Sequence, residues 1–357
     1  MIANVRIHRL LTTFSVIVAT SAAPLQADDW QTIAPGGETR CSTGTPYRFH
    51  VRQGADDRLM VFFNGGGACW SAATCDISGA AGSKPTYRPF ASAEAGNDPR
   101  QYDGAFAVDN PQNPFRDWSQ VFVSYCTGDV HLGTVDHRYE RPDGSAFTIH
   151  HRGRINAQAV FDYVSANFPR LTRLFVAGSS AGAVSSPVFA AMLADRFPDA
   201  DVVQFGGGGG IYRLDPPTQL WRNWGVFERW PEIFDDSQYS SADTTLMDLY
   251  LMAHDAVPGI AYHQYDNAND GVQQQFQNML GAPIDPLEGL NANRAFLRES
   301  LPRFRSYTAP GKFHSLLRFE VFYEQSVNGI SATDWVQKIA NGESVKDVHC
   351  GTAEACR

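Results

Sequence analysis

The chain has 357 residues, which is enough for one large domain with a single hydrophobic core or for two smaller ones. Hydrophobic residues make up 43% of it and aromatic residues 12%, which is typical of a packed globular protein and excludes a disordered one. The net charge of -9 excludes the basic surface with which a nucleic-acid-binding protein meets phosphates. We therefore expect no nucleic acid as a partner and no attraction to anionic membranes.

The first 27 residues have the pattern of a signal peptide. Arg6 and Arg9 precede an apolar run at 10–23, and small residues flank candidate cleavage sites after Ala23 and Ala27. The run is shorter than the roughly 20 residues that span a bilayer, so an uncleaved anchor is the less favoured alternative. No other segment is long and apolar enough to be a stable membrane span. We expect the chain to be exported, and either secreted or periplasmic.

The first strongly apolar β-type run, residues 59–63 (LMVFF), is followed by the glycine-rich sequence Asn64-Gly65-Gly66-Gly67. In lipases and esterases such a loop after an early strand supplies backbone amides to an oxyanion hole. Alone it is weak evidence, because a flexible turn has the same composition.

Strands and helices alternate along the rest of the chain. Further strands are predicted at 121–124, 174–177, 201–205, 259–265 and 305–308, and helices at 155–167, 181–197 and 333–339. This alternation predicts an α/β fold with a mostly parallel sheet and helices on both faces. The loops at the carboxyl ends of such strands are where sites form.

Asp129 and His131 follow the strand at 121–124. They could contact a substrate or orient the loop that carries the nucleophile, or they could simply hold their own loop by hydrogen bonds. His150 and His151 lie close to two arginines, but they do not have the spacing of a metal site. No dinucleotide fingerprint or phosphate-binding loop is present, so we expect neither a cofactor nor a metal.

The strand at 174–177 leads into Gly178-Ser179-Ser180-Ala181-Gly182 and then into the helix at 181–197. A G-x-S-x-G sequence between a strand and a helix is the nucleophile elbow of α/β-hydrolases. The turn is so tight that it needs small neighbours, and it raises the serine above the sheet at the positive end of a helix. We predict Ser180 as the nucleophile and the Ala181 amide as an oxyanion donor.

The pattern changes in the region of about 211–258. Trp221, Trp224, Phe227 and Trp230 recur at a spacing of three, which predicts one face of a helix. That face could pack against the core, or it could form the aromatic wall of a helical cap over the active site.

A serine nucleophile needs a base, and α/β-hydrolases have the order serine, acid, histidine. Of the histidines after Ser180, His314 lies in a loop behind the strand at 305–308, where the base belongs. His254 and His263 precede or lie within the strand before the acid, and His349 lies beside Cys350. We predict His314 as the base.

The acid should follow the strand at 259–265. Asp266 and Asp270 both do so, and spacing does not choose between them. Either could instead cap the next helix, because aspartate is a favoured N-cap residue.

An even number of cysteines in an exported chain favours disulfides. Six cysteines allow fifteen pairings, so the sequence alone does not decide among them. Close spacing favours Cys69–Cys75 and Cys350–Cys356, which leaves Cys41–Cys126. A zinc site is the alternative, but the spacing of zinc ligands is missing.

Together these segments resemble the pectin acetylesterase family, which includes Notum-like carboxylesterases. The resemblance follows the family's order over most of the mature chain, in segments 62–76 (FFNGGGACWSAATCD), 121–133 (VFVSYCTGDVHLG), 176–182 (VAGSSAG), 270–273 (DGVQ) and 311–314 (GKFH). It implies a single α/β-hydrolase domain at 28–357 that removes acyl groups from oxygen esters.

The resemblance also implies residue roles. Ser180 matches the family's nucleophile, His314 its base and Asp270 its acid, since Asp270-x-x-Gln273 fits the family pattern better than Asp266 does. The family's oxyanion donors match Gly66, Gly67 and Ala181, and Cys69–Cys75 and Cys41–Cys126 match family disulfides. Two departures are the glycine run 206–210, where many relatives have Asp-Ser-Gly, and the divergent region 211–258.

The sequence thus predicts an exported serine carboxylic-ester hydrolase. The expected substrate is a small-molecule or polysaccharide ester, with O-deacetylation of an acetylated carbohydrate as the first hypothesis. One alternative is a lipid or polyester hydrolase, which an apolar pocket near the aromatic region would favour. Another is a catalytically silent binding protein on the same fold.

Overall fold

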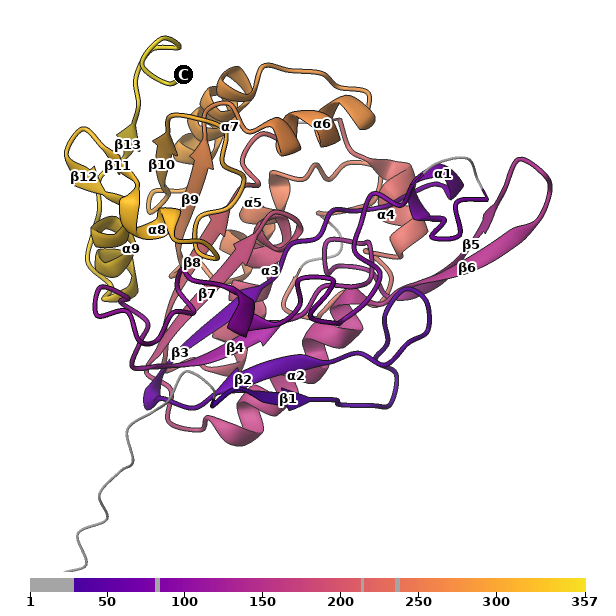
Figure 1. The fold of residues 1–357 in the computed structure, drawn as a ribbon, viewed down its shortest axis with the longest axis horizontal. Coiled ribbons are helices and arrows are strands. Elements are labelled where there is room, and N and C mark those ends of the chain that lie inside the picture. The colour runs from indigo at the N-terminus through magenta and orange to yellow at the C-terminus, as the bar shows by residue number, and fades with distance from the viewer. Residues whose placement is uncertain (1–28, 81–83, 213–214, 235–237) are drawn as a thin grey trace, which may run out of the picture.

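The computed structural model describes residues 29–80, 84–212, 215–234 and 238–357, so the expected signal peptide lies outside the described residues. Figure 1 shows the order of the elements. The helices are α1 (Ala72–Cys75), the 3-10 helix η1 (Pro99–Gln101), α2 (Gly153–Asn167), α3 (Ala181–Arg196), α4 (Thr218–Trp224), α5 (Asp248–Ala256), α6 (Gly271–Met279), α7 (Pro286–Ser300), α8 (Val321–Glu324) and α9 (Ala332–Ala340). The strands are β1 (Gln31–Ile33), β2 (Phe49–Arg52), β3 (Ala55–Phe63), β4 (Trp118–Val123), β5 (Val135–Glu140), β6 (Ala146–His151), β7 (Arg173–Ser179), β8 (Asp201–Gly207), β9 (Ala261–Asn267), β10 (Arg305–Ala309), β11 (Ser326–Val327), β12 (Ile330–Ser331) and β13 (Val348–His349).

The centre of the described chain is a nine-stranded sheet in the order β1-β2-β4-β3-β7-β8-β9-β10-β13. β1 pairs antiparallel with β2, and β2 pairs antiparallel with β4. All further neighbours, from β4 to β13, pair in parallel. The carboxyl ends of the parallel strands therefore meet at one edge, which is where sites of open α/β sheets form. The predicted α/β fold with a mostly parallel sheet is confirmed.

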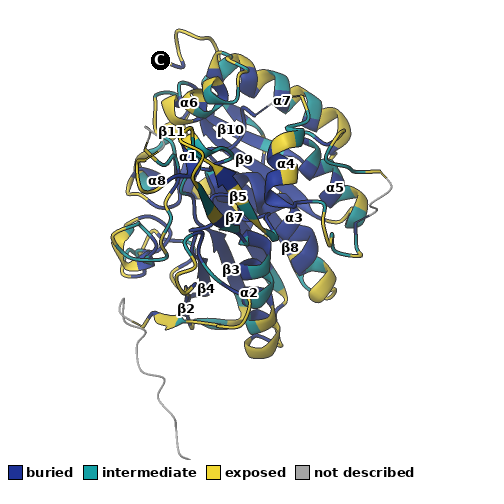
Figure 2. Cartoon of the chain, turned by 90° about the vertical axis from the view of Figure 1, so that its right-hand side faces the viewer, coloured by how far each residue is buried: buried dark blue, intermediate teal, exposed yellow. Residues whose placement is uncertain are grey.

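Apolar side chains cover both faces of this sheet, because successive residues of a strand point to opposite sides. On β3, Leu59, Val61 and Phe63 belong to the cluster that also contains residues of α2, α3 and α5. Met60 and Phe62 belong to the opposite cluster, to which α9 contributes. Figure 2 shows the central strands β3, β7, β8 and β9 mostly in the buried colour and the exposed colour on the outer faces of the helices. The two layers hold the sheet edge that carries the site.

All six strands predicted from apolar runs are present as β3, β4, β7, β8, β9 and β10, and the three predicted helices are α2, α3 and α9. None of the described helices has the length and apolar character that a bilayer span requires.

Three disulfides join the cysteines: the pairs Cys69–Cys75 and Cys350–Cys356, which the spacing favoured, and the remaining pair Cys41–Cys126. The first joins residues 85 apart in sequence, and each of the others joins residues six apart. Disulfides of this kind persist in oxidising compartments, which agrees with an extracellular or periplasmic protein.

The prediction of one helical face for four aromatic residues is wrong. α4 ends at Trp224, because Gly225 follows with a φ of 62° in the left-handed conformation that terminates helices. Phe227 and Trp230 therefore lie in the segment behind the helix, where their rings stack on each other with centroids 5.4 Å apart. Of the region 211–258, α4 borders a cavity described below, whereas α5 packs on α3 in the main core.

Candidate active site

Ser180 occupies a strained turn between β7 and α3. Its φ is 56° and its ψ is -120°, a conformation that costs a non-glycine residue about 1–3 kcal/mol. The turn needs glycine on both sides. A Cβ at Gly178 would lie 2.1 Å from the Gly182 carbonyl oxygen, and one at Gly182 would lie 2.1 Å from the Phe63 carbonyl oxygen. The Ser180 amide donates to the Gly207 carbonyl at 2.8 Å, which fixes the turn on the neighbouring strand β8.

The glycine-rich loop after β3 lies directly against this turn. A Cβ at Gly65 would be 2.6 Å from the Ser179 carbonyl oxygen and 2.7 Å from the Ser180 Cβ. Gly67 has a φ of 79° and forms an isolated bridge with Tyr87. The close approach explains why glycine occupies this loop.

Backbone amides near Ser180 are available to a substrate oxygen. Ala181 is the first residue of α3, so its amide has no acceptor within the helix. The amides of Gly66 and Gly67 donate to no other group of the described chain. The two loops thus bring three backbone donors to the Ser180 side of the sheet edge.

His314 and Asp270 are joined by a hydrogen bond. Asp270 lies behind β9 as the N-cap of α6, and His314 lies in the loop behind β10. The His314 Nδ1 is 2.7 Å from the Asp270 Oδ2. The other carboxylate oxygen accepts from the amides of Val272 at 2.9 Å and Gln273 at 3.1 Å. Asp270 is fully buried and therefore rigidly placed.

The alternative acid, Asp266, has different partners. Its Oδ1 accepts from the Gly210 amide at 3.1 Å and from the Gln273 side chain at 2.9 Å. Burial raises the pKa of Asp266 to about 7. The carboxylate that contacts His314 is that of Asp270, which the family resemblance favoured and spacing alone did not.

Ser180 and His314 border the same groove, which has an empty volume of about 1110 Å³ including space open to solvent. The His314 Nε2 is buried and has no hydrogen-bond partner in the described chain, so the Ser180 hydroxyl does not yet donate to it. Such bonds are often long in enzymes without substrate and shorten in the reacting complex. The ring with this unpaired nitrogen thus belongs to a residue that borders the same groove as the serine.

Two features that position the loop of His314 were not predicted from the sequence. A Cβ at Gly208, whose φ is 75°, would lie 2.1 Å from the His314 carbonyl oxygen, so the glycine run after β8 makes room for the histidine loop. The Ser179 and Ser315 hydroxyls are 2.7 Å apart and join that loop to the serine turn. The departure from the family pattern at 206–210 could have drawn attention to the first contact, but no sequence signal points to the second.

Asp129 and His131 are buried and support the glycine-rich loop. The His131 Nε2 lies 2.8 Å from the Asn64 carbonyl oxygen, and the His131 amide donates to the Asp129 carboxylate at 3.1 Å. Asp129 also accepts from the Gly153 amide at 2.8 Å, and burial raises its pKa to about 6. Burial lowers the pKa of His131 to about 4, so the ring is neutral near pH 7. Both residues therefore fix backbone segments next to the site by hydrogen bonds.

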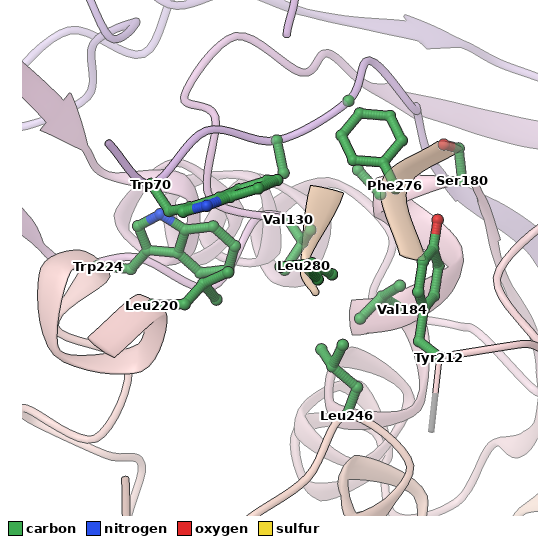
Figure 3. A pocket seen from close by; sticks show the side chains of 13 residues that line it. Trp70, Val130, Ser180, Val184, Tyr212, Leu220, Trp224, Leu246, Phe276 and Leu280 are labelled. Atoms are coloured by element: carbon green, nitrogen blue, oxygen red, sulfur yellow. The ribbon is translucent and has the colours of Figure 1, made fainter. Parts of the chain in front are cut away.

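Ser180 also borders an apolar cavity (Figure 3). Its empty volume is about 470 Å³, part of it open to solvent. Figure 3 shows Trp70, Leu220 and Trp224 across the cavity from Ser180. Val184, one helical turn after Ser180 on α3, also lines it. Trp224 thus borders the cavity as the sequence allowed.

A cluster of Cys69, Cys75 and His151 has atoms within 4.8 Å of one another. Its sulfurs are joined in a disulfide and so are not thiolate ligands. Both ring nitrogens of His151 are engaged, with the Tyr139 hydroxyl at 2.9 Å and the Thr127 carbonyl oxygen at 2.9 Å. The cluster fits a packed structural core, not a zinc site.

Comparison with known proteins agrees with this geometry. The family model described as pectinacetylesterase matches residues 32–220, which is more than half of the chain. The chain belongs to the pectinacetylesterase family. The family places it among the carboxylic ester hydrolases, which confirms the predicted enzyme class.

One relative of this pectinacetylesterase-family chain is the palmitoleoyl-protein carboxylesterase notum2 of Xenopus laevis, 29% identical over 147 residues. The match covers 40% of this chain and 27% of that relative's length. The Wnt deacylase Notum from Drosophila has a similar fold in two crystal forms. In the first the TM-score is 0.61 at 16% identity, over 91% of this chain and 96% of that one. In the second it is 0.59 at 15% identity, over 88% and 94%.

Proposed function

We propose that this chain is a serine carboxylesterase in which Ser180 attacks the ester carbonyl, His314 takes its proton and Asp270 orients His314. The observation that carries the proposal is the 2.7 Å contact between His314 and Asp270, together with the unpaired Nε2 of the same ring and the groove that His314 and Ser180 both border. A carboxylate only accepts, so Nδ1 carries the proton and Nε2 is left as the acceptor.

The amides of Gly66, Gly67 and Ala181 stabilise the oxyanion of the tetrahedral intermediate. Support comes from the closeness of the glycine-rich loop to Ser180 and from the lack of other acceptors for these amides within the described chain. Loss of one such donor typically lowers turnover by about 10²–10³. His314 then protonates the departing alcohol, and water releases the acyl group from Ser180 by the same steps in reverse.

The substrate class is an O-acyl ester of a small molecule or polysaccharide. The first hypothesis, an acetyl ester of a carbohydrate, makes little use of the apolar cavity beside Ser180. The cavity favours the second candidate, an ester with a longer apolar acyl chain such as a lipid or polyester, because each buried methylene contributes about 0.8 kcal/mol. Export to the periplasm or medium remains part of the proposal and is supported by the three disulfides.

A fluorophosphonate reagent tests the nucleophile. Wild type should be labelled at Ser180, and Ser180→Ala should lose both the adduct and ester hydrolysis while staying folded. Ser185→Ala is the matched control, because Ser185 is a fully buried serine of the same helix whose hydroxyl only donates to the Gly182 carbonyl. Absence of an adduct on folded wild type would favour the silent binding protein.

The acid is tested by Asp270→Asn and Asp266→Asn. Replacing the acid of a serine–histidine–aspartate triad by its amide lowers turnover by about 10⁴. We expect that loss for Asp270→Asn and a much smaller one for Asp266→Asn. The reverse order would assign the role to Asp266.

A further inference from the structure

A cation next to the reacting groups is buried without a carboxylate partner. Arg318 is 6% exposed. Its Nε donates to the Ser315 hydroxyl at 3.1 Å, and its Nη1 donates to the Asn64 side-chain oxygen at 3.2 Å and the Tyr102 hydroxyl at 3.4 Å. These acceptors are all neutral. In the described chain no carboxylate forms an ion pair with Arg318, and its Nη2 donates to none of the described groups.

A buried charge is costly unless an opposite charge accompanies it, and most buried arginines have one. Here burial lowers the pKa of Arg318, and the positive charge of Arg88 lowers it further. The guanidinium is thus held by neutral acceptors and by the rings of Tyr102 and Phe319, whose centroids lie 5.3 and 5.2 Å away, with one nitrogen unused and no negative charge beside it. An arginine in that state is prepared to bind an anion, since its planar fork matches carboxylate, sulfate and phosphate oxygens.

Two more cations border the same groove as Arg318. Arg88 and Lys84 are exposed, and neither forms an ion pair within the described residues. No carboxylate is among the residues that line the groove. In a chain with a net charge of -9, this is a local concentration of positive charge.

The position of His314 tells which part of an ester would lie in this groove. The histidine must reach the oxygen of the departing alcohol to protonate it. His314 borders the cationic groove and does not line the apolar cavity, whereas Ser180 borders both. The acyl group therefore belongs in the cavity and the alcohol in the groove, beside Arg318.

We propose that Arg318, assisted by Arg88 and Lys84, binds a negatively charged group on the alcohol part of the substrate, so that the enzyme selects acyl esters of anionic alcohols. The anion is a carboxylate, sulfate or phosphate. This inference rests on the proposed function, because it takes Ser180 and His314 as the reacting groups.

The test compares acetyl esters that differ in charge and little else. The anionic esters are para-acetoxybenzoate, para-acetoxybenzenesulfonate and para-acetoxyphenyl phosphate, and the neutral one is para-acetoxybenzamide. Each kcat/KM is divided by the alkaline hydrolysis rate of the same ester, which removes differences between the leaving groups. We expect wild type to favour at least one anionic ester by about tenfold or more, as a charge-assisted hydrogen bond provides. The ester with the largest preference identifies the anion.

The preference should fall to within about threefold in Arg318→Gln and should partly return in Arg318→Lys, which keeps the charge. Structural damage alone would lower both rates and leave their ratio unchanged. Arg88→Gln should reduce the ratio to a smaller extent. Arg58→Gln is the control, because Arg58 lies toward the opposite edge of the sheet on β3 and should leave the ratio as in wild type.

The outcomes separate this inference from the proposed function. If Ser180-dependent hydrolysis is present but all four esters react alike, or Arg318→Gln leaves the preference intact, the anion site is refuted and the esterase stands. If hydrolysis persists in Ser180→Ala, the proposed function itself fails.

Discussion

The apolar cavity predicts how the rate should depend on acyl length. From acetyl to hexanoyl an ester gains four methylenes, each contributing about 0.8 kcal/mol when buried, or about 3 kcal/mol together. If the cavity takes the whole chain and this energy is retained in the transition state, kcat/KM rises by about 200-fold. A series of para-nitrophenyl esters from acetyl to octanoyl measures this slope directly.

Val184→Phe should remove the dependence, because residue 184 lies one turn behind Ser180 and lines the cavity. The larger ring would occupy the space of the acyl chain, so the hexanoyl-to-acetyl ratio should fall below about ten while acetyl hydrolysis changes little. The substitution enlarges a buried residue and should lower stability by about 1–3 kcal/mol, which thermal unfolding will show.

Val188→Leu is the matched control, since Val188 is buried one turn further along α3 and does not line the cavity. It should leave the slope unchanged. A wild-type rate that is flat from acetyl to butanoyl would refute the assignment of the cavity to the acyl group. A slope that survives in folded Val184→Phe would do the same.

Three other predictions follow from strain, bracing and burial. Ser180→Gly should abolish hydrolysis yet raise the free energy of unfolding by about 1 kcal/mol, since glycine adopts this conformation without strain, and a denaturant titration will measure it. The double variant Cys350→Ser/Cys356→Ser should lose about 2 kcal/mol of stability and should also have a lower kcat at temperatures where it is still folded. The reason is that the Cys356 carbonyl accepts from the amide of Gly311, in the loop of His314, at 3.2 Å. Steady-state kinetics below the unfolding temperature is the assay. The unfolding temperature should fall as the pH drops from about 6.5 to about 4. Burial lowers the pKa of four histidines in the folded chain, so the unfolded chain takes up protons in this range that the folded chain does not. Two buried aspartates with raised pKa values have the opposite effect on stability, but they are fewer than the histidines. The groups are His131, His151, His263 and His349 against Asp129 and Asp266.

The sheet was predictable because its central strands are buried on both faces and read as continuous apolar runs. α6 was not, since it is short and buries only the polar Gln273 and Gln277, while its apolar residues Val272, Phe276 and Met279 stay at least partly exposed. The hairpin of β5 and β6 was missed for a related reason, as most of its residues are at least partly exposed. The spacing of three among the aromatic residues misled, because it extends past Gly225, where the backbone leaves the helix.

At the site, the serine turn was predictable because its local geometry demands glycine at fixed positions. The choice between Asp266 and Asp270 was not, since both follow the same strand and only the three-dimensional register decides which carboxylate reaches His314. No sequence pattern around Arg318 marks it as a residue of the site. Its environment comes from Asn64, Tyr102 and Ser315, which lie on three separate segments of the chain.

Ser180 lies between an apolar cavity and a groove that carries cations, so the two products of the proposed reaction would occupy different spaces. In the proposed reaction the acyl chain would still fill the apolar cavity after the alcohol has left through the groove, so the second nucleophile would have to arrive along the same groove. In the groove, water would have no advantage over another hydroxyl compound that fits. If the proposed reaction is right, such an arrangement would let the acyl group pass to another alcohol whenever that alcohol occupies the groove before water does.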